Sequence, residues 1–281
     1  MRFSKDSHIL VDALHRLPGF PPALMAVIRA CACEVCSVAE IAEAVGREEV
    51  LASQVVRAAN MAALGAAQVV DNVVLAVGRL GSSAVRGLAV AQFLSTSLAP
   101  NLLQSGLDRR ALWRHHLAVA AGSSGAAGHG SERSDAHLAG LVHDVGRLIF
   151  AAHLGGRYAE CMAEADETGE ALVVVEARQF GLCHAELGAE AARQWKFAPA
   201  VVEAMAHHHD AVNAAGSAGL ALSVMVADEV ANAGGYSAGV GGPCLWSRSD
   251  CDAPAGTGAR REGAERALAR EAPLIEALLT G

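Results

Sequence analysis

The sequence predicts an all-α fold, and three observations point to it. Hydrophobic residues make up 52% of the 281 residues, but aromatic residues only 4%, and alanine supplies much of the apolar content. Alanine is the strongest helix former, so this composition favours packed helices. Apolar residues recur at helical spacing, and no segment shows the apolar–polar alternation of a half-buried strand. A chain of this length can bury a core in one large domain or two small ones.

The first group of helices is predicted between a proline-rich start and a break near residue 100. After an N-terminal extension (residues 1–16), Leu17-Pro18-Gly19-Phe20-Pro21-Pro22 places proline at a helix start. Ser37, with Glu40 three residues later, has the spacing of a capping box. We therefore assign residues 17–105 to an N-terminal helical subdomain. Its expected helices cover about residues 23–33, 38–45, 48–63, 73–80 and 85–98.

A second helical subdomain is predicted over residues 106–233. Its expected helices cover about residues 109–121, 136–153, 157–168, 171–180, 184–196, 199–207 and 218–232. Residues 122–134 are rich in glycine and serine and are expected to form a surface loop. Residues 234–281 are expected to form a mobile Gly/Ser/Pro-rich loop, up to residue 263, and a C-terminal helix over 264–279.

Composition and charge exclude several classes of protein. The formal net charge of −8 repels phosphate backbones and argues against a nucleic-acid partner. The most apolar stretch, residues 73–99, is interrupted by Arg79 and Arg86, so no membrane span is expected. The N-terminus lacks the apolar segment of a signal peptide. Seven cysteines fit reduced thiols better than a disulfide framework, so we expect a cytoplasmic protein.

Several of the twelve histidines fall on apolar helix faces. His184 shares a stripe with Leu187, Ala191 and Trp195, and the neighbours His115 and His116 share one with Leu112 and Val119. His208 and His209 continue the face of Val201 and Met205. Asp228 lies one turn beyond Val224, in a helix that is otherwise apolar there. These side chains are predicted to point into the core.

His143 and Asp144 are less clear from periodicity. In the expected helix they share an arc with Arg147, opposite the apolar residues, and that arc could face solvent. The nearby Gly140 and Gly146 would allow another helix or a ligand to approach this arc closely.

A single inward histidine is more often a hydrogen-bonded core residue than a metal ligand. Several inward imidazoles with an inward aspartate are harder to satisfy, because helical carbonyls are already hydrogen-bonded. A shared cation would satisfy them together, since buried charges are normally paired or bound to metal. The helical faces alone leave a metal site and a polar core both open.

The motif around His143 resembles a known family. Gly140-Leu141-Val142-His143-Asp144-Val145-Gly146-Arg147-Leu148 is similar to the motif of the HD superfamily of metal-dependent phosphohydrolases. Further motifs resemble its HDOD branch, in the right order and spacing over residues 17–232. They are Leu17-Pro18 with Pro21-Pro22, Arg57-Ala58-Ala59-Asn60-Met61-Ala62, Ala76-Val77-Gly78-Arg79-Leu80-Gly81, Phe180-Gly181-Leu182-Cys183-His184-Ala185-Glu186-Leu187-Gly188 and His208-His209.

The resemblance implies two helical subdomains, of which the C-terminal one is HD-superfamily-like, and a set of metal ligands. The implied ligands are His115, His143, Asp144, His184, His208, His209 and Asp228. Mixed imidazole and carboxylate ligands suit one or two divalent ions of Fe, Mn, Zn or Ni better than Ca. In an enzyme, such ions activate water for attack on phosphorus. Asp144 and Arg147 are the residues we would then assign to the reaction, with Arg147 holding a phosphate.

Two differences from related enzymes bear on whether this protein catalyses a reaction. The related cyclic-dinucleotide phosphodiesterases carry Gly-Tyr-Pro after the paired histidines, whereas this chain continues Asp210-Ala211-Val212-Asn213. Arg147 stands where those enzymes usually have lysine, and arginine is a poor proton donor.

The leading hypothesis is therefore an HDOD-type regulatory or signalling module that holds a divalent metal. Its expected partner is a signalling protein or a phosphorylated small molecule. The first alternative is a metal-dependent phosphohydrolase acting on a nucleotide or another phosphoester. The second is a metal-free scaffold whose histidines stabilise its core.

Cys31, Cys33 and Cys36 form a C-x-C-x-x-C motif at the end of the first expected helix. The motif is compatible with a redox sensor or a small metal clip. We favour the alternative, that these are small buried apolar residues and one exposed thiol. No fourth metal ligand is evident near it.

Overall fold

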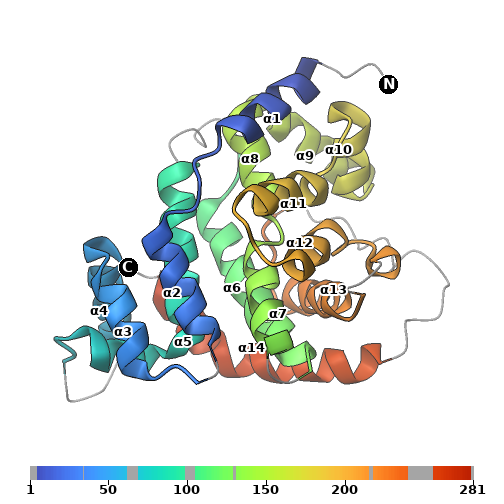
Figure 1. Cartoon of the computed structure of the whole chain (residues 1–281). Helices are drawn as coiled ribbons and strands as arrows, with labels where there is room; N and C mark the ends of the chain where they lie inside the picture. The colour runs from blue at the N-terminus through green and yellow to red at the C-terminus, as the bar shows by residue number, and fades with distance from the viewer. Residues whose placement is uncertain are drawn as a thin grey trace. The chain divides into compact units, whose positions relative to one another are not determined.

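The computed structural model describes residues 5–33, 35–61, 69–98, 105–128, 131–214, 218–239 and 256–279 (Figure 1). Helices form all of its regular structure, and no strand occurs among these residues, which confirms the all-α prediction. The chain divides into a larger unit, Met1–Gly19 with Ser97–Ala269, and a smaller unit, Phe20–Thr96 with Arg270–Gly281. The break expected near residue 100 and most of the glycine-rich stretch expected after residue 234 lie outside the described residues.

The smaller unit contains α2 (Pro22–Ala32), α3 (Val38–Gly46), α4 (Glu49–Met61) and α5 (Val73–Ser97). Proline occupies the first turn of α2, where its missing N–H costs nothing. The predicted capping box is present, because Glu40 N donates to Ser37 Oγ (3.3 Å) and Ser37 N donates to the Glu40 carboxylate (2.7 Å). The two helices expected over 73–98 form the single element α5, interrupted at Gly81, whose φ of 78° suits glycine.

By length and composition alone, α5 is long and apolar enough to cross a membrane. Half of its most apolar window is buried inside the protein, and the buried residues include the charged Arg86. A buried core helix passes the same test of length and composition.

The larger unit begins with α1 (Lys5–Arg16), which packs against α8 and pairs Asp6 with Arg157. Its central helices contact one another around a common core: α6 packs on α7 and α13, and α12 packs on α7, α11 and α13 (Figure 1). The remaining elements follow in order: α6 (Arg109–Ala126), α7 (Ser131–Val142), α8 (Val145–Leu154), α9 (Gly156–Thr168), α10 (Leu172–Phe180), α11 (His184–Gln194), α12 (Pro199–Ala206), a 3-10 turn (Ala211–Asn213) and α13 (Ala218–Ala233). The last helix, α14 (Thr257–Leu279), belongs to the larger unit up to Ala269 and to the smaller unit from Arg270.

Two local predictions in this unit are wrong. The loop expected over 122–134 is mostly helical, because its glycines serve helix packing and not a turn. A Cβ on Gly122 would lie 2.9 Å from Ala227 Cβ, and one on Gly125 would lie 2.5 Å from Ala267 Cβ. The single helix expected over 136–153 is instead two helices, α7 and α8, with His143 and Asp144 between them.

The predicted role of the glycines near His143 is confirmed. A Cβ on Gly146 would lie 2.9 Å from His184 Cα in the backbone of α11, and one on Gly140 would lie 2.8 Å from Val119 O of α6. The junction between α7 and α8 is therefore held between α6 and α11 by direct backbone approach.

We expect Gly146→Ala to lower the free energy of unfolding by about 1–3 kcal/mol, because the new methyl group meets backbone atoms that cannot move aside independently. Denaturant unfolding measures the change. Gly156→Ala is the control, because no atom lies within 4 Å of a Cβ at Gly156. The control should change stability by less than about 1 kcal/mol. Equal stabilities of the two variants would contradict the close approach.

Candidate metal centre

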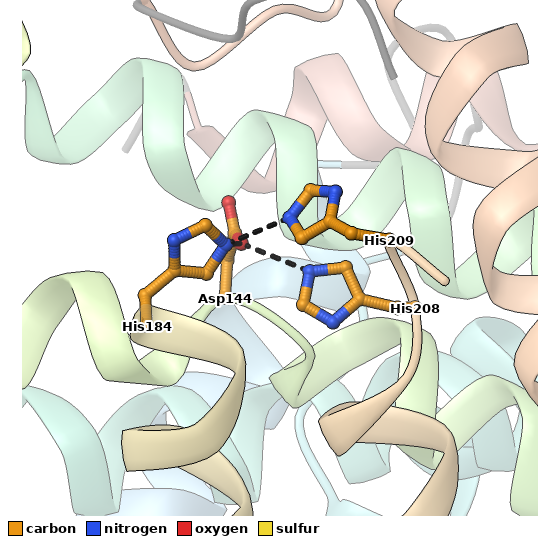
Figure 2. Close-up of side chains that lie close together, drawn as sticks. All are labelled: Asp144, His184, His208 and His209. Atoms are coloured by element: carbon orange, nitrogen blue, oxygen red, sulfur yellow. Dashed lines mark hydrogen bonds and ion pairs between the residues drawn. The ribbon is translucent and has the colours of Figure 1, made fainter. Parts of the chain in front are cut away.

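The structure brings all seven predicted ligand residues together, in two adjacent groups. One group consists of Asp144, His184, His208 and His209, and the other of His115, His143 and Asp228. Within each group the candidate ligand atoms lie within 4.8 Å of one another. Figure 2 shows the rings of the first group gathered around the Asp144 carboxylate.

Different helices of the larger unit supply these residues. His115 lies in α6 and Asp228 in α13, and His184 is the first residue of α11. His208 and His209 lie in the turn after α12, beyond its C-cap His207. His143 and Asp144 occupy the break between α7 and α8, where they are only 1% and 4% exposed. The possibility that their arc faces solvent is thereby excluded, because the glycines on either side bring α6 and α11 against it.

The Asp144 carboxylate lies at the centre of both groups. Its Oδ1 is 3.1 Å from His184 Nε2, 3.6 Å from His208 Nε2 and 3.7 Å from His143 Nε2. Its Oδ2 accepts a hydrogen bond from Arg147 at 2.9 Å and lies 4.0 Å from His115 Nε2. Burial raises the pKa of Asp144, but the nearby imidazoles and the Arg147 guanidinium outweigh it and hold the pKa well below its usual range.

Four imidazoles are oriented through their Nδ1 atoms. His115 Nδ1 donates to Tyr236 O (2.9 Å), His143 Nδ1 to Gly140 O (2.7 Å), and His208 Nδ1 to Met205 O (2.6 Å). His184 Nδ1 donates to the Glu176 carboxylate at 2.7 Å. These partners only accept hydrogen bonds, so each Nδ1 carries hydrogen and each Nε2 is turned toward the cluster. Metal-ligating histidines are held in the same way.

The Nε2 atoms are poorly satisfied by one another. His184 Nε2 lies 2.9 Å from His209 Nε2, and His115 Nε2 lies 3.3 Å from His143 Nε2. His115 Nε2 also lies 3.2 Å from the Asp228 carboxylate. His208 Nε2 is buried without a hydrogen-bond partner among the described residues. Nitrogen lone pairs that face a common point require a cation or a proton there.

The protein's own protons partly meet this requirement. Burial lowers the pKa of His184, but Glu176 and Asp144 outweigh it and raise the pKa to about 10. Burial also opposes a charge on His115, yet Asp228 and Asp144 raise its pKa. Burial, only partly offset by Asp144, lowers the pKa of His143 to about 4, and burial with the neighbouring imidazoles holds that of His209 well below its usual value. The pair of His184 and His209 therefore combines a protonated and a neutral ring near neutral pH, and in the pair of His115 and His143 the proton is favoured on His115.

The residues present fit a divalent metal. They offer several buried imidazole Nε2 atoms and two carboxylates, and the Nδ1 atoms are already fixed by other partners. A cation at either group would replace a proton shared between two rings, and the neighbouring carboxylates would balance its charge.

Glu176 belongs to this centre although the sequence analysis did not identify it. Its buried carboxylate accepts hydrogen bonds from His184 Nδ1 (2.7 Å), from His184 N (2.8 Å) and from the Tyr158 hydroxyl (2.8 Å). A signal was present in the sequence, because Glu176 stands one turn from both Leu172 and Phe180 on the apolar face of α10.

Arg114 and Tyr236 were also missed, because they act through a backbone carbonyl. Arg114 donates to Gly235 O (2.7 Å), and its guanidinium lies 4.2 Å from the centre of the Tyr236 ring. These contacts fix the residues that follow α13, so that Tyr236 O can orient His115. The composition of this segment predicted a mobile loop, which these contacts contradict for Gly235 and Tyr236.

Arg147 and His116 lie beside the cluster. Arg147 is 4% exposed and donates to Asp144, so its guanidinium is already engaged with the central carboxylate. His116 is fully buried 5.4 Å from the Trp113 ring, and neither of its ring nitrogens has a hydrogen-bond partner among the described residues. Burial holds the pKa of His116 well below its usual value, so the ring stays neutral.

The sequence profile of the HDOD domain matches residues 17–211 of the chain. The chain belongs to the HDOD family. An uncharacterised protein of Treponema pallidum (strain Nichols) is 25% identical to it in an alignment of 209 residues that covers 72% of this chain. Those residues span only 39% of that relative's length.

Two solved structures have a similar fold. An HDOD domain protein of unknown function from Geobacter sulfurreducens has a TM-score of 0.72 at 21% identity, covering 98% of this chain and 96% of that one. A candidate phosphohydrolase from Shewanella amazonensis SB2B has a TM-score of 0.66 at 21% identity, covering 97% of each chain. At this level of identity the similarity establishes the helical HDOD fold.

We expect Glu176→Gln to lower the pKa of His184 from about 10, because the substitution removes a negative charge that stabilises the imidazolium. NMR titration of the ring in chelator-treated protein measures the change. The stability that this ion pair adds is present below about pH 6.5 and is lost as the pH rises through the folded-state pKa. The control is Glu190→Gln, which alters an exposed ion pair on α11, the helix of His184, and should leave the titration unchanged. An unaltered His184 pKa in the Glu176 variant would refute the assignment.

Proposed function

We propose that this HDOD protein is a regulatory module whose helical core holds one or two divalent ions of Fe, Mn, Zn or Ni. The proposed ligands are the seven residues of the two groups. The observation that carries the proposal is the convergence of imidazole Nε2 atoms on Asp144, with the Nδ1 atoms of four rings fixed from behind. A polar core without metal would gain nothing from leaving His208 Nε2 buried without a hydrogen bond, 3.6 Å from the Asp144 carboxylate.

Each surrounding residue has a role toward such an ion. Asp144 presents its two oxygens to different groups, so it can serve both. Glu176 holds the His184 ring and increases its basicity, and Arg147 balances the negative charge of Asp144. When bound, a divalent cation supplies Lewis acidity toward water or a phosphoryl oxygen.

Access to the cluster favours a regulatory role over hydrolysis. The side chains of His115, His143, His184 and His208 are 3% exposed or less, and that of Asp228 is 15% exposed. Only the edge near Asp228 and His209 is partly open among the described residues. Arg147, which we had considered for holding a phosphate, is occupied by Asp144, and arginine is a poor proton donor.

The second candidate function is a metal-dependent phosphohydrolase acting on a nucleotide or another phosphoester. It is favoured by the complete set of imidazole and carboxylate ligands, with Asp144 and Arg147 as the reacting residues. The fold shared with the candidate phosphohydrolase of Shewanella amazonensis is compatible with it. For either function, we propose a cytoplasmic protein that responds to a signalling partner or a phosphorylated small molecule.

Elemental analysis of protein purified without a histidine tag tests the metal site. We expect one or two divalent ions per chain, absent from the double variant His143→Ala, Asp144→Ala. The matched control is His153→Ala, Asp166→Ala, which removes the same residue types from exposed positions of the same unit and should keep the metal. If the wild-type protein stayed metal-free after incubation with each of the four ions, only the hypothesis of a metal-free scaffold would remain.

Metal binding should release protons, and its affinity should rise between pH 6 and 8. Because the pKa of His184 is raised to about 10, a proton must leave Nε2 before the ring can bind a cation. Calorimetric titration in two buffers of different ionisation enthalpy counts the released protons. A binding constant that does not change with pH would show that His184 is not a ligand.

Hydrolysis of a panel of phosphoesters by the metal-loaded protein distinguishes the two functions. The regulatory proposal predicts no turnover above that of the His143→Ala, Asp144→Ala variant. Turnover that the variant loses and the exposed control variant keeps would establish the phosphohydrolase instead.

A further inference from the structure

The three cysteines of the C-x-C-x-x-C motif lie where α2 joins α3 in the smaller unit. Cys31 is in the last turn of α2 and is buried. Cys33 directly follows α2, and Cys36 directly precedes Ser37, the N-cap of α3. Cys33 and Cys36 are both partly exposed thiols, so a small reagent in solution can reach them.

A turn brings Cys33 and Cys36 together. Cys36 N donates to Cys33 O at 3.4 Å, which closes a four-residue turn. Such turns hold the two end Cα atoms within about 7 Å. Disulfides usually need a Cα separation of about 4.4–6.8 Å. The two thiols are also close enough for each to shift the pKa of the other.

The same geometry decides between the alternatives for this motif. Among the described residues, the groups with three candidate ligand atoms within 4.8 Å of one another do not include the three thiols. Two thiols alone do not make the tetrahedral site of a metal clip. Cys31 packs as a small apolar residue, and the other two form a separate pair.

Cys33 has the environment of a nucleophile. The neighbouring Cys36 thiol, together with the N–H groups of Val35 and Cys36, lowers the pKa of the Cys33 thiol. The pKa of Cys36 is raised to about 11, chiefly by the neighbouring Cys33 thiol. Burial raises the pKa of Cys31 to about 12, which leaves that thiol unreactive.

We propose that Cys33 and Cys36 form a redox-active dithiol, which a peroxide oxidises to a disulfide across the turn between α2 and α3. The Cys33 thiolate attacks one peroxide oxygen, the O–O bond breaks, and the departing oxygen takes up a proton to leave as water. Cys33 is then a sulfenic acid. The Cys36 sulfur attacks it, the S–S bond forms, the S–O bond breaks, and the hydroxyl leaves with the Cys36 proton as a second water. A dithiol reductant reverses the reaction by exchange.

This dithiol is independent of the metal proposal. Its residues belong to the smaller unit, whereas all seven candidate ligands belong to the larger one. The capping box of Ser37 and Glu40 starts α3 without any contribution from the thiols, so the disulfide can form and break while both helices remain in place.

Peptide mapping of the full-length protein after treatment with hydrogen peroxide and alkylation of free thiols tests the proposal. Glu34 is the one glutamate between Cys33 and Cys36, so a glutamate-specific protease separates them. We expect the two fragments to stay joined until a reductant is added. The proposal would be overturned if the two fragments separated without reductant although the same peroxide treatment had oxidised another pair of thiols in the protein.

Three serine variants assign the roles. Cys31→Ser should form the link as fast as the wild type, which excludes Cys31 as a partner. Cys36→Ser should accumulate a sulfenic acid on Cys33, which a 1,3-dione reagent traps. Cys33→Ser should react with peroxide at this motif about tenfold more slowly, because the remaining thiol is protonated at neutral pH. Loss of the link in Cys31→Ser would show that the pairing is wrong.

Discussion

An ionised carboxylate inside a helical core must be surrounded by positive charge or hydrogen-bond donors, and Asp144 imposes this requirement on the larger unit. The requirement is met from several elements at once: by Arg147 in the first turn of α8, by His184 at the start of α11, and by His208 after α12. The helices can come this close only because Gly140 and Gly146 lack side chains. The close packing of these helices and the gathering of polar groups around Asp144 therefore both depend on the two glycines.

The cluster behaves as a set of sites at which protons and metal ions compete. Asp144 raises the affinity of His115 and His184 for protons, together with Asp228 at His115 and Glu176 at His184. Asp144 and Asp228 would also attract a divalent cation. His143 and His209 remain neutral beside them and can donate a lone pair at any pH near neutrality. A site of this kind needs no rearrangement to exchange protons for metal, because the fixed Nδ1 contacts already direct the Nε2 atoms inward.

The sequence predicted the helical class and most of the cluster, because helix periodicity reports which side chains face the core. His115, His184, His208 and Asp228 were placed inward on that basis. Periodicity failed at His143 and Asp144, since it assumed one continuous helix where α7 ends and α8 begins. It also misread Gly122 and Gly125 as loop residues, because composition cannot distinguish a glycine in a turn from one at a helix contact. The carbonyl of Tyr236 had no side-chain signal to detect.

The seven candidate ligands come from separate elements of the larger unit, and this distribution determines what a bound metal would stabilise. α6, α11 and α13, the turn after α12 and the break between α7 and α8 each contribute to it. Cations bound at the two groups would therefore add further links between elements that are already joined by apolar packing and by polar contacts such as those of His184 with Asp144 and of His115 with Asp228. Their binding free energy would add to the stability of this arrangement and not of any single helix. The amount of bound metal, or the pH that competes with it, would then set how firmly these helices are held. A partner that recognises their arrangement would detect that change without any reaction taking place at the ion.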